Sequence, residues 1–216
     1  VHGSRDVIFV AVLTALITCT IGVTLGVASG FMGGKVDAAL MTAVDIFLTI
    51  PGFPLLLVVV GLTRDLIARA PFLMAFVLSV TAWAGLARSI RSQVLSFKEK
   101  EFIEAAKTLG LGTTHILLSE VIPNLMPYIA MNIIIGMTGA IYAQVGLYFL
   151  GILPSTPTNW GVMLNLVSNQ LLGLIYSKGG IYYIMTPIMC ILLLQLGLVL
   201  LTEATDEIFN PRLREE

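Results

Sequence analysis

The sequence predicts an all-α polytopic membrane protein with about five transmembrane helices. Hydrophobic residues make up 57% of the 216 residues and charged residues only 12%. Soluble proteins carry about a quarter charged residues. Long uncharged runs alternate with short polar stretches, and each run is long enough for the roughly 20 apolar residues that a membrane-spanning helix needs. We treat residues 1–216 as a single transmembrane domain.

The boundaries of the expected spans follow from the places where the apolar runs are interrupted. We expect spans at 7–31, 38–62, 71–95, 122–150 and 181–202. Residues 155–176 carry apolar residues at helical spacing beside Asn, Ser and Gln, which is typical of an amphipathic helix on a membrane surface. No initiator Met and no signal-peptide pattern precede the first span, so we expect the chain to lack its true N-terminus.

The first span carries Gly22, Gly26 and Gly30 at four-residue spacing. Small residues on one helix face allow close approach of another helix in lipid, so this face is expected to pack against a second span. Cys19 and Cys190 both lie within apolar spans, which favours core residues over a disulfide framework.

The second span contains Asp45, the one ionisable residue well inside an apolar stretch, followed by Pro51 and Pro54. A charge at that depth is costly, so Asp45 is expected to have a partner and to face the bundle interior or water. The prolines predict a broken helix. Two roles stay open for Asp45: it lines a path, or it ties the broken helix to neighbouring groups.

The third span ends with Trp83, Arg88 and Arg91, which we interpret as membrane-interface anchors. The fourth span contains small and polar residues that favour packing on a partner subunit or lining of a cavity over contact with lipid. These are Gly136, Thr138, Gly139, Tyr142, Gln144 and Gly146.

Residues 98–120 form the one long polar island in the chain. Phe102, Ala105, Ala106 and Leu109 fall on one face of a predicted helix, which Gly110 ends. Thr113 is expected to cap a second helix over 114–120, which Pro123 closes. The island is either a plain connector or a docking surface whose small residues let another protein approach closely.

The basic residues predict the orientation of the chain in the membrane. Lys35, Arg88, Arg91, Lys98, Lys100, Lys107, Arg212 and Arg214 fall on one side of the five spans, and Arg5, Arg64, Arg69 and Lys178 on the other. Cytoplasmic loops carry the excess of basic residues. The island and the C-terminus are therefore expected in the cytoplasm, and residues 1–6 and 155–176 outside.

The island resembles the cytoplasmic signature loop of ABC importer permeases. Glu104-Ala105-Ala106, three residues, Gly110 and then Ile122-Pro123 follow that pattern, although Glu120 and Ile122 replace two of its hydrophobic residues. Further segments resemble the C-type permeases of the dipeptide, oligopeptide and nickel branch. These are Gly3-Ser4-Arg5, Gly33-Gly34 with Asp37, Val44-Asp45 with Pro51, Tyr148-Phe149-Leu150-Gly151, Pro157 with Trp160-Gly161 and Met163-Leu164, and Asn210-Pro211-Arg212-Leu213.

The resemblance implies a type I ABC importer permease fold with one more spanning helix upstream. It implies a multi-pass subunit of a prokaryotic plasma or inner membrane that forms half of a translocation path. The expected partners are a sister permease in a heterodimer, two ATP-binding subunits that carry ATP and Mg, and an external substrate-binding protein. The expected substrate is a di- or oligopeptide, with nickel or an oligosaccharide as alternatives in the same family. No cofactor and no nucleic acid are expected on this chain.

The resemblance also assigns site residues. The ATPase-coupling residues are Glu104, Ala105, Ala106, Leu109, Gly110, Thr113 and His115. The expected translocation-path residues are Asp45, Gly136, Gly139, Tyr142 and Gln144, the last at a position where many relatives carry an acidic residue.

Two other functional classes find less support in the sequence. An intramembrane hydrolase needs a Ser-His or Asp-Asp pair at membrane depth, and Asp45 stands alone there. A channel or secondary transporter is expected to show inverted repeats and several buried charges, and neither pattern is found. No Gly-x-x-x-x-Gly-Lys-Ser/Thr phosphate-binding loop is present, so ATP binding by that route is excluded. His2 and His115 are expected on opposite membrane sides, which excludes a metal pair. We therefore expect a transport subunit and not an enzyme.

Overall fold

The computed structural model describes residues 2–154, 159–176 and 180–209, and every regular element within these ranges is helical. The helices are α1 His2–Met32, α2 Gly34–Thr49, α3 Gly52–Arg69, α4 Pro71–Lys98, α5 Glu101–Thr108, α6 Thr113–His115, α7 Ile122–Phe149, α8 Trp160–Tyr176 and α9 Gly180–Phe209, with a π-helical turn, η1, at Ile116–Val121. In this part of the chain four helices are long and apolar enough to cross a membrane, or five if the bent pair α2 and α3 is one span. The expected all-α membrane class is confirmed.

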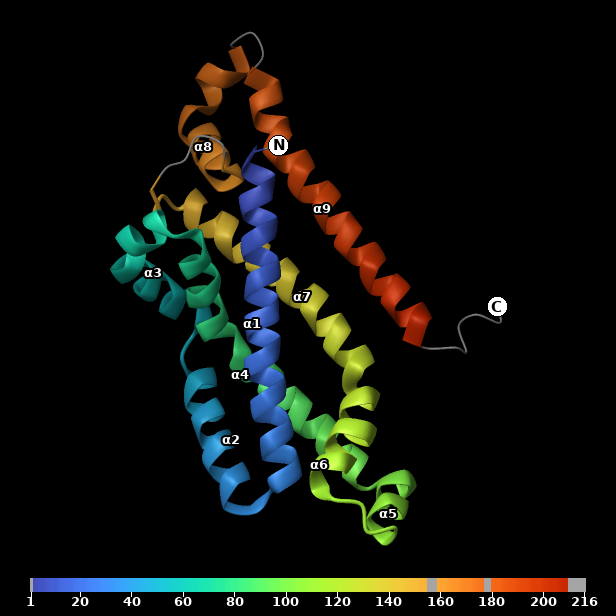
Figure 1. Cartoon of the computed structure of the whole chain (residues 1–216). Helices are drawn as coiled ribbons and strands as arrows, with labels where there is room; N and C mark the ends of the chain where they lie inside the picture. Colours follow the sequence, from blue (N-terminus) through green and yellow to red (C-terminus); the bar gives the residue numbers. More distant parts are fainter. Residues whose placement is uncertain (1, 155–158, 177–179, 210–216) are drawn as a thin grey trace.

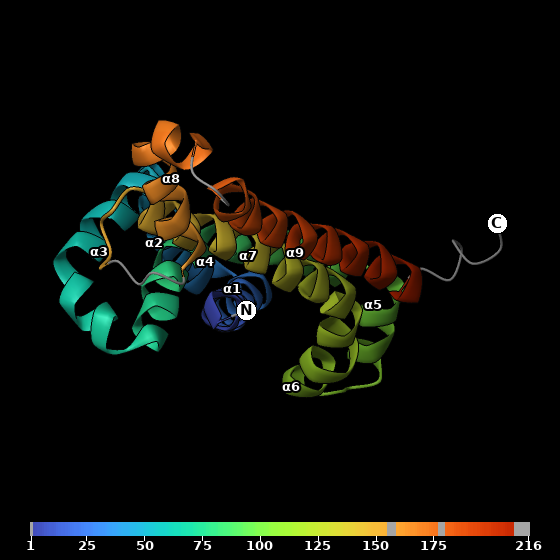
Figure 2. The same cartoon turned by 90° about the horizontal axis from the view of Figure 1, so that it is seen from above.

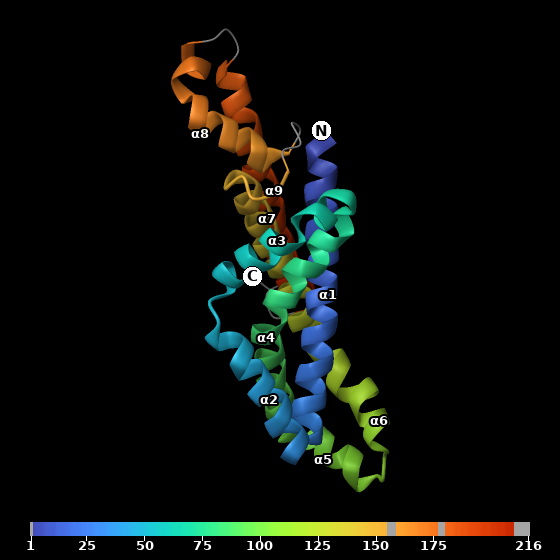
Figure 3. The same ribbon diagram turned by 90° about the vertical axis from the view of Figure 1, so that its left-hand side faces the viewer.

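The long helices run beside one another and separate two ends of the molecule (Figure 1). The turn between α1 and α2 lies at the same end as α5 and α6, whereas α8 and the start of α1 lie at the opposite end. Figure 3 shows the same separation from the side. The polar island and the segment around α8 therefore occupy opposite ends, as the expected order of spans requires. Residues 155–158 of the expected amphipathic segment, and the 210–213 motif, lie outside the described residues.

The glycine face of α1 packs directly on α4. A Cβ atom built on Gly26 would lie 2.6 Å from the carbonyl oxygen of Ala87, and one built on Gly30 would lie 3.0 Å from that of Arg91. Gly22 faces the side chain of Leu86 in the same way. A side chain at Gly26 would strike backbone, so the two helix axes can be this close only because the residue is glycine. The predicted small-residue face is confirmed, and its partner is α4.

The second expected span is broken. The axes of α2 and α3 differ by 84°, and the break falls at Ile50 and Pro51, where Ile50 is extended. A residue before proline is disfavoured in the helical region, so the break predicted at Pro51 is confirmed. Pro54 does not break the chain, because it lies in the first turn of α3, where backbone N–H groups have no helical acceptor. Figure 2 shows α3 extending sideways from the helices around α1.

The second helix of the island, expected over 114–120, is not closed by Pro123, so that expectation was wrong. Residues 113–149 form one continuous helical run, in which the N–H of Ile122 donates to the carbonyl of Leu117 in the π-helical turn. A π-helical turn shifts the hydrogen-bond register, so a residue without an N–H group can follow it without ending the helix. Thr113 is the first residue of α6 and not its cap, because Gly112 precedes it in an extended conformation without a side-chain bond.

The core has a separate apolar cluster at the end that carries α5. Ile90 and Val94 of α4 are fully buried there against Ile103 of α5 and Val121 of η1. Cys19 is buried in the same cluster, and Cys190 packs partly buried against the larger cluster at the other end. α5 is therefore fixed to the bundle by burial of apolar side chains.

The close approach of α1 to α4 gives a stability prediction. Gly26→Ala adds one methyl group against the Ala87 carbonyl oxygen, and overpacking of this kind costs about 1–3 kcal/mol. We expect a lower midpoint of thermal unfolding for the detergent-solubilised protein, followed by size-exclusion chromatography after heating. Gly61→Ala in α3 is the control, because nothing lies within 4 Å of that position. Equal midpoints for the two variants would contradict the packing described.

Candidate functional site

The surface of α5 is divided between a buried strip and an exposed apolar strip. Ile103 and Ala106 are buried against the bundle, whereas Phe102, Ala105 and Leu109 are exposed. The sequence placed Phe102, Ala105, Ala106 and Leu109 on one face, but only Ala106 of these is buried. We call the exposed apolar residues of this end the end patch: Phe102, Ala105, Leu109, Leu111 and Leu118. Its most exposed member, Leu109, is 78% exposed.

A glycine turn fixes how the chain leaves α5. Gly110 adopts φ 73°, its N–H donates to the Lys107 carbonyl (2.9 Å), and the Leu111 N–H donates to the Ala106 carbonyl (3.2 Å). This pair of bonds is the Schellman arrangement that ends a helix, and it favours glycine in the left-handed position. The turn directs the chain into α6 and η1, which return to the bundle beside α5.

The structure gathers the predicted coupling residues at one end of the molecule. Glu104 is exposed on α5, and Thr113 and His115 are exposed at the start of the returning helix. Ala106 alone among the seven is buried. Phe102, Ala105 and Leu109 of the end patch share one exposed face of α5, because residues three and four apart lie on the same side of a helix.

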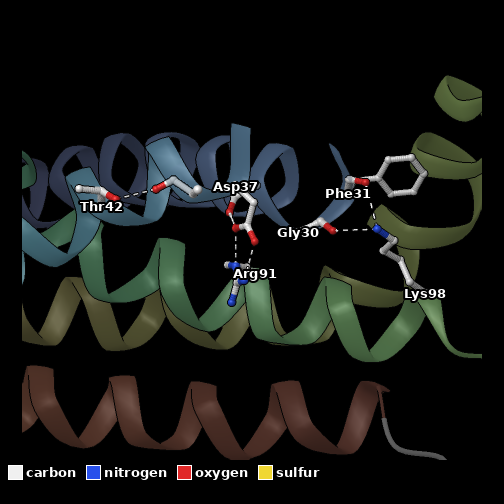
Figure 4. Close-up of polar contacts among 8 residues, drawn as sticks. Gly30, Phe31, Asp37, Thr42, Arg91 and Lys98 are labelled. Atoms are coloured by element: carbon white, nitrogen blue, oxygen red, sulfur yellow. Dashed lines mark hydrogen bonds and ion pairs between the residues drawn. The ribbon is translucent and has the colours of Figure 1, made fainter. Parts of the chain in front are cut away.

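A cluster of charged residues lies near this end, between α1, α2 and α4 (Figure 4). Arg91 donates through Nε to Asp37 Oδ1 (2.5 Å) and through Nη2 to Asp37 Oδ2 (2.6 Å). Ser29 of α1, itself fully buried, donates its hydroxyl to Asp37. The two-pronged contact between guanidinium and carboxylate fixes distance and orientation together, so it sets the position of α2 against α4.

A second ion pair joins the same two helices closer to the break. Arg88 donates to Asp45, with about half of each side chain exposed (53% and 60%). The partner that the sequence predicted for Asp45 is therefore Arg88. The sequence interpretation of Arg88 and Arg91 as interface anchors missed both pairs. Two acids eight residues apart on one helix, and two arginines three residues apart on another, were a signal for pairing that we did not use.

Lys98 closes the end of α1. Its Nζ donates to the carbonyl oxygens of Gly30 (3.2 Å) and Phe31 (3.1 Å) and lies 5.7 Å from the centre of the Phe31 ring. The last carbonyl groups of a helix receive no N–H donor from the helix itself. A cation at this terminus is also favoured by the helix dipole. Figure 4 shows Lys98 reaching from the end of α4 to this helix terminus.

The expected path residues of α7 do not share one surface. Gly139 and Tyr142 are exposed, whereas a Cβ atom on Gly136 would meet the Cβ atom of Ala15 at 3.4 Å. Gln144 is 2% exposed, and its Oε1 atom has no hydrogen-bond partner. Tyr142 borders a groove of about 300 Å³ between α7 and α9, lined by Ile134, Ile135, Thr138, Tyr142, Gln195, Leu198, Val199 and Thr202.

Gln144 belongs to a different hollow. It lines a cavity of about 140 Å³ at the α8 end of the molecule, together with Asp6 of α1, Tyr148 of α7 and Asn159 before α8. The groove beside Tyr142 and this cavity lie on different sides of α7. Among the expected path residues of α7, only Gly139 and Tyr142 are on its exposed face.

The two ion pairs are expected to differ in energy. The Asp37–Arg91 pair is bidentate and has exposed fractions of 31% for Arg91 and 19% for Asp37, so a double-mutant cycle with alanine should give a coupling of about 0.5–3 kcal/mol. The more exposed Asp45–Arg88 pair should give about 0–1 kcal/mol. The measurement is the unfolding free energy of wild type, single and double variants in mild detergent. A larger coupling free energy for Asp45–Arg88 than for Asp37–Arg91 would contradict this order.

Comparison with known proteins identifies the family of the chain. Residues 22–215 match the family described as "Binding-protein-dependent transport system inner membrane component". The oligopeptide transport system permease protein OppC of Bacillus subtilis is 29% identical over 214 residues, which cover 99% of this chain and 67% of that protein. The dipeptide transport system permease protein DppC of B. subtilis is 34% identical over 167 residues, 76% of this chain and 50% of that protein. DppC of Lactococcus lactis is 30% identical over 188 residues, 86% of this chain and 52% of that protein.

A solved structure has the same fold. The MetNI methionine ABC transporter in inward-facing conformations contains a chain that superposes with a TM-score of 0.71 at 18% identity, covering 96% of this chain and 93% of that one. The matched regions of the two DppC relatives span about half of those proteins. The resemblance found in the sequence is confirmed, and the chain belongs to the inner-membrane components of binding-protein-dependent transport systems, which are transport subunits and not enzymes.

Proposed function

We propose that this chain is a permease subunit of an ATP-driven importer, forms half of a translocation path, and couples that path to separate ATPase subunits. The observation that carries the proposal is the end patch. It is apolar, exposed and placed outside the long helices, at the tip of the molecule. Exposed apolar residues that gather on one helix face mark a candidate interaction site.

The end patch has the properties of a prepared docking surface. α5 is anchored to the bundle by the buried Ile103 and Ala106, and the Gly110 turn fixes its end. The patch therefore does not need to order on binding, which lowers the entropic cost of association. Glu104, exposed on the same helix, offers a carboxylate to a basic group of the partner. The ATPase subunits, which hold ATP and Mg, are the partners that we propose for this surface.

We infer that the end carrying α5 is cytoplasmic. Five basic residues lie at this end of the molecule: Lys35 at the start of α2, Arg91 and Lys98 in the last two turns of α4, and Lys100 and Lys107 at α5. Cytoplasmic segments are rich in basic residues. α8, at the opposite end, then faces the outside of a prokaryotic plasma or inner membrane, where an external substrate-binding protein delivers substrate. α9 leads away from the α8 end, which supports the proposal that the chain beyond it is cytoplasmic too.

We propose that the path passes the exposed face of α7 and is completed by a sister permease. Tyr142 and the neighbouring groove supply hydroxyl and amide groups on an otherwise apolar surface. Gly139 leaves this face open, and Asp45 with Arg88 forms an exposed ion pair on α2 and α4. These groups suit passage of a polar solute. Gly136, which packs on Ala15, and the buried Gln144 are better explained as packing residues than as path residues.

We propose a di- or oligopeptide as the substrate, because the OppC and DppC relatives carry peptide transport in their names. The test is uptake into proteoliposomes that contain the whole transporter, with labelled dipeptides, a labelled tripeptide, Ni²⁺ and a labelled oligosaccharide offered separately. ATP-dependent uptake of the peptides alone is the expected result. Uptake of Ni²⁺ or the oligosaccharide in their place would assign the chain to another branch of the family.

The docking proposal predicts the effect of changes on the end patch. Ala105→Trp overfills the contact with a bulky side chain. Leu109→Asp places a charge where apolar contact is expected, and a desolvated unpaired charge costs about 2–5 kcal/mol. Each variant should lower copurification of the ATPase subunits by about tenfold or more. Both side chains are exposed, so membrane insertion should be unchanged. Asn169→Trp, exposed on α8 at the opposite end, is the control. Wild-type copurification in both patch variants would leave α5 as a connector.

A further inference from the structure

α2 is attached to the rest of the molecule with little apolar burial. All 16 residues of α2 are described, and Val44 is the one that is buried. Val44 packs with Ala84 and Ala87 of α4, and Leu25, Met41 and Trp83 pack partly buried around them. Phe47 meets Trp83 edge to face, with 5.1 Å between the ring centres. These contacts involve Met41, Val44 and Phe47, whereas no side chain in the first two turns of α2 is buried, so apolar contacts leave the start of α2 weakly held.

The Asp37–Arg91 pair supplies what the apolar contacts lack. It joins the first turn of α2 to α4 through two parallel hydrogen bonds, and Ser29 joins the same carboxylate to α1. A planar guanidinium that binds both carboxylate oxygens restricts rotation as well as separation. The contact is half-buried, so solvent screens it less than the Asp45–Arg88 pair.

Lys98 joins the end of α1 to the end of α4 close to α5, the helix that carries most of the end patch. It is the last residue of α4, holds the end of α1 through two carbonyl oxygens, and is separated from the first residue of α5, Glu101, by two residues. The Lys100 N–H donates to the Phe97 carbonyl (3.0 Å), so the connection is a tight turn. Because this turn is short, α5 can move only a little before α4 must move with it.

We propose that Arg91 and Lys98 are positioning residues for transport, which together make the end of α1, the start of α2 and the end of α4 move as one unit with α5. This inference rests on the proposed docking of α5 to an ATPase subunit. The two residues have separate tasks. The glycine face already holds α1 on α4, so Lys98 reinforces an existing contact. Arg91 is the link that holds the start of α2.

The consequence concerns the coupling of ATP hydrolysis to uptake. If the Asp37–Arg91 link is lost, α4 can follow α5 while α2 and the broken span beyond it lag behind. ATP hydrolysis then continues, but fewer substrate molecules are moved for each ATP. A link that serves only folding would instead change the amount of assembled transporter and leave the ratio of uptake to hydrolysis unchanged.

The experiment replaces the ion pair by a removable covalent link. Asp37→Cys and Arg91→Cys are combined in a background with Cys19→Ala and Cys190→Ala, and the whole transporter is reconstituted in proteoliposomes. A short bis-methanethiosulfonate reagent joins the two thiols, and dithiothreitol releases them. Uptake of the labelled tripeptide and ATP hydrolysis are measured on the same vesicles, together with copurification of the ATPase subunits.

We expect uptake per ATP to fall by about tenfold when the thiols are free, because misplacement of a remote element can cost one to two orders of magnitude. The cross-link should restore the ratio to within about threefold of the Cys-less background, a difference worth less than about 1 kcal/mol. The reagent should not change the Cys-less background, and Thr42→Val, on α2 with only a bond to its own helix, should keep the wild-type ratio.

Three results would overturn the inference. In the first, uptake per ATP stays at the background value while the thiols are free. In the second, uptake per ATP stays low after cross-linking, which means that α2 must detach from α4 during transport. In the third, the ATPase subunits no longer copurify, which means that the pair shapes the docking surface.

The exchanged pair Asp37→Arg/Arg91→Asp is the second variant, expected to keep uptake per ATP. Failure of both the cysteine and the exchanged variants to accumulate would reduce the pair to a folding role. Absence of tripeptide uptake or of ATPase copurification in the wild type would contradict the proposed function instead.

Discussion

The close contact between α1 and α4 is the constraint on which the rest of the structure depends. Gly26 lets the backbone of α4 approach so near that one added methyl group would meet the Ala87 carbonyl oxygen. In lipid, helices gain little from hiding apolar side chains from water, so such close van der Waals packing is what holds them together. α4 then carries α5 two residues beyond its end, and α7 packs against α1 beside Ala15. The position of the end patch is thus set by a helix pair that starts at the other end of the molecule.

The second feature of the architecture is that ion pairs hold the start of α2. α2 buries only Val44. It meets α4 through Asp37 with Arg91, through Asp45 with Arg88, and through the edge-to-face contact of Phe47 with Trp83. Ionisable groups in spanning segments are expensive unless paired, and directional pairs fix geometry more strictly than apolar contacts do. The break at Pro51 then turns α3 away from α2 by 84°. A helix that buries little, is positioned partly by charges and precedes a break is suited to transmit movement between the end patch and the proposed translocation path.

Much of this arrangement could be predicted from the sequence, because its signals are local. The Gly22, Gly26 and Gly30 spacing gave the packing face of α1, Pro51 gave the break, and Gly110 gave the end of α5. Where a prediction depended on contacts distant in the chain, it failed or stayed open. Periodicity could not show that Ile103 and Ala106, and not Phe102 and Leu109, form the buried strip of α5, since both strips are apolar. The π-helical turn that carries the helix past Pro123 has no sequence signature, and the partner of Asp45 lies 43 residues away.

We propose that the end patch is the surface on which an ATPase subunit docks. Photo-cross-linking in cells tests it most directly, with a photoreactive amino acid placed at Leu109 or, for comparison, at Tyr182, which is 75% exposed on α9 near the α8 end. After irradiation, mass spectrometry of the cross-linked products identifies the neighbour of each position. We expect an ATPase subunit joined to position 109 and none joined to position 182. Irradiation that joins the ATPase subunit to position 182, with lipid or no protein at position 109, would contradict it.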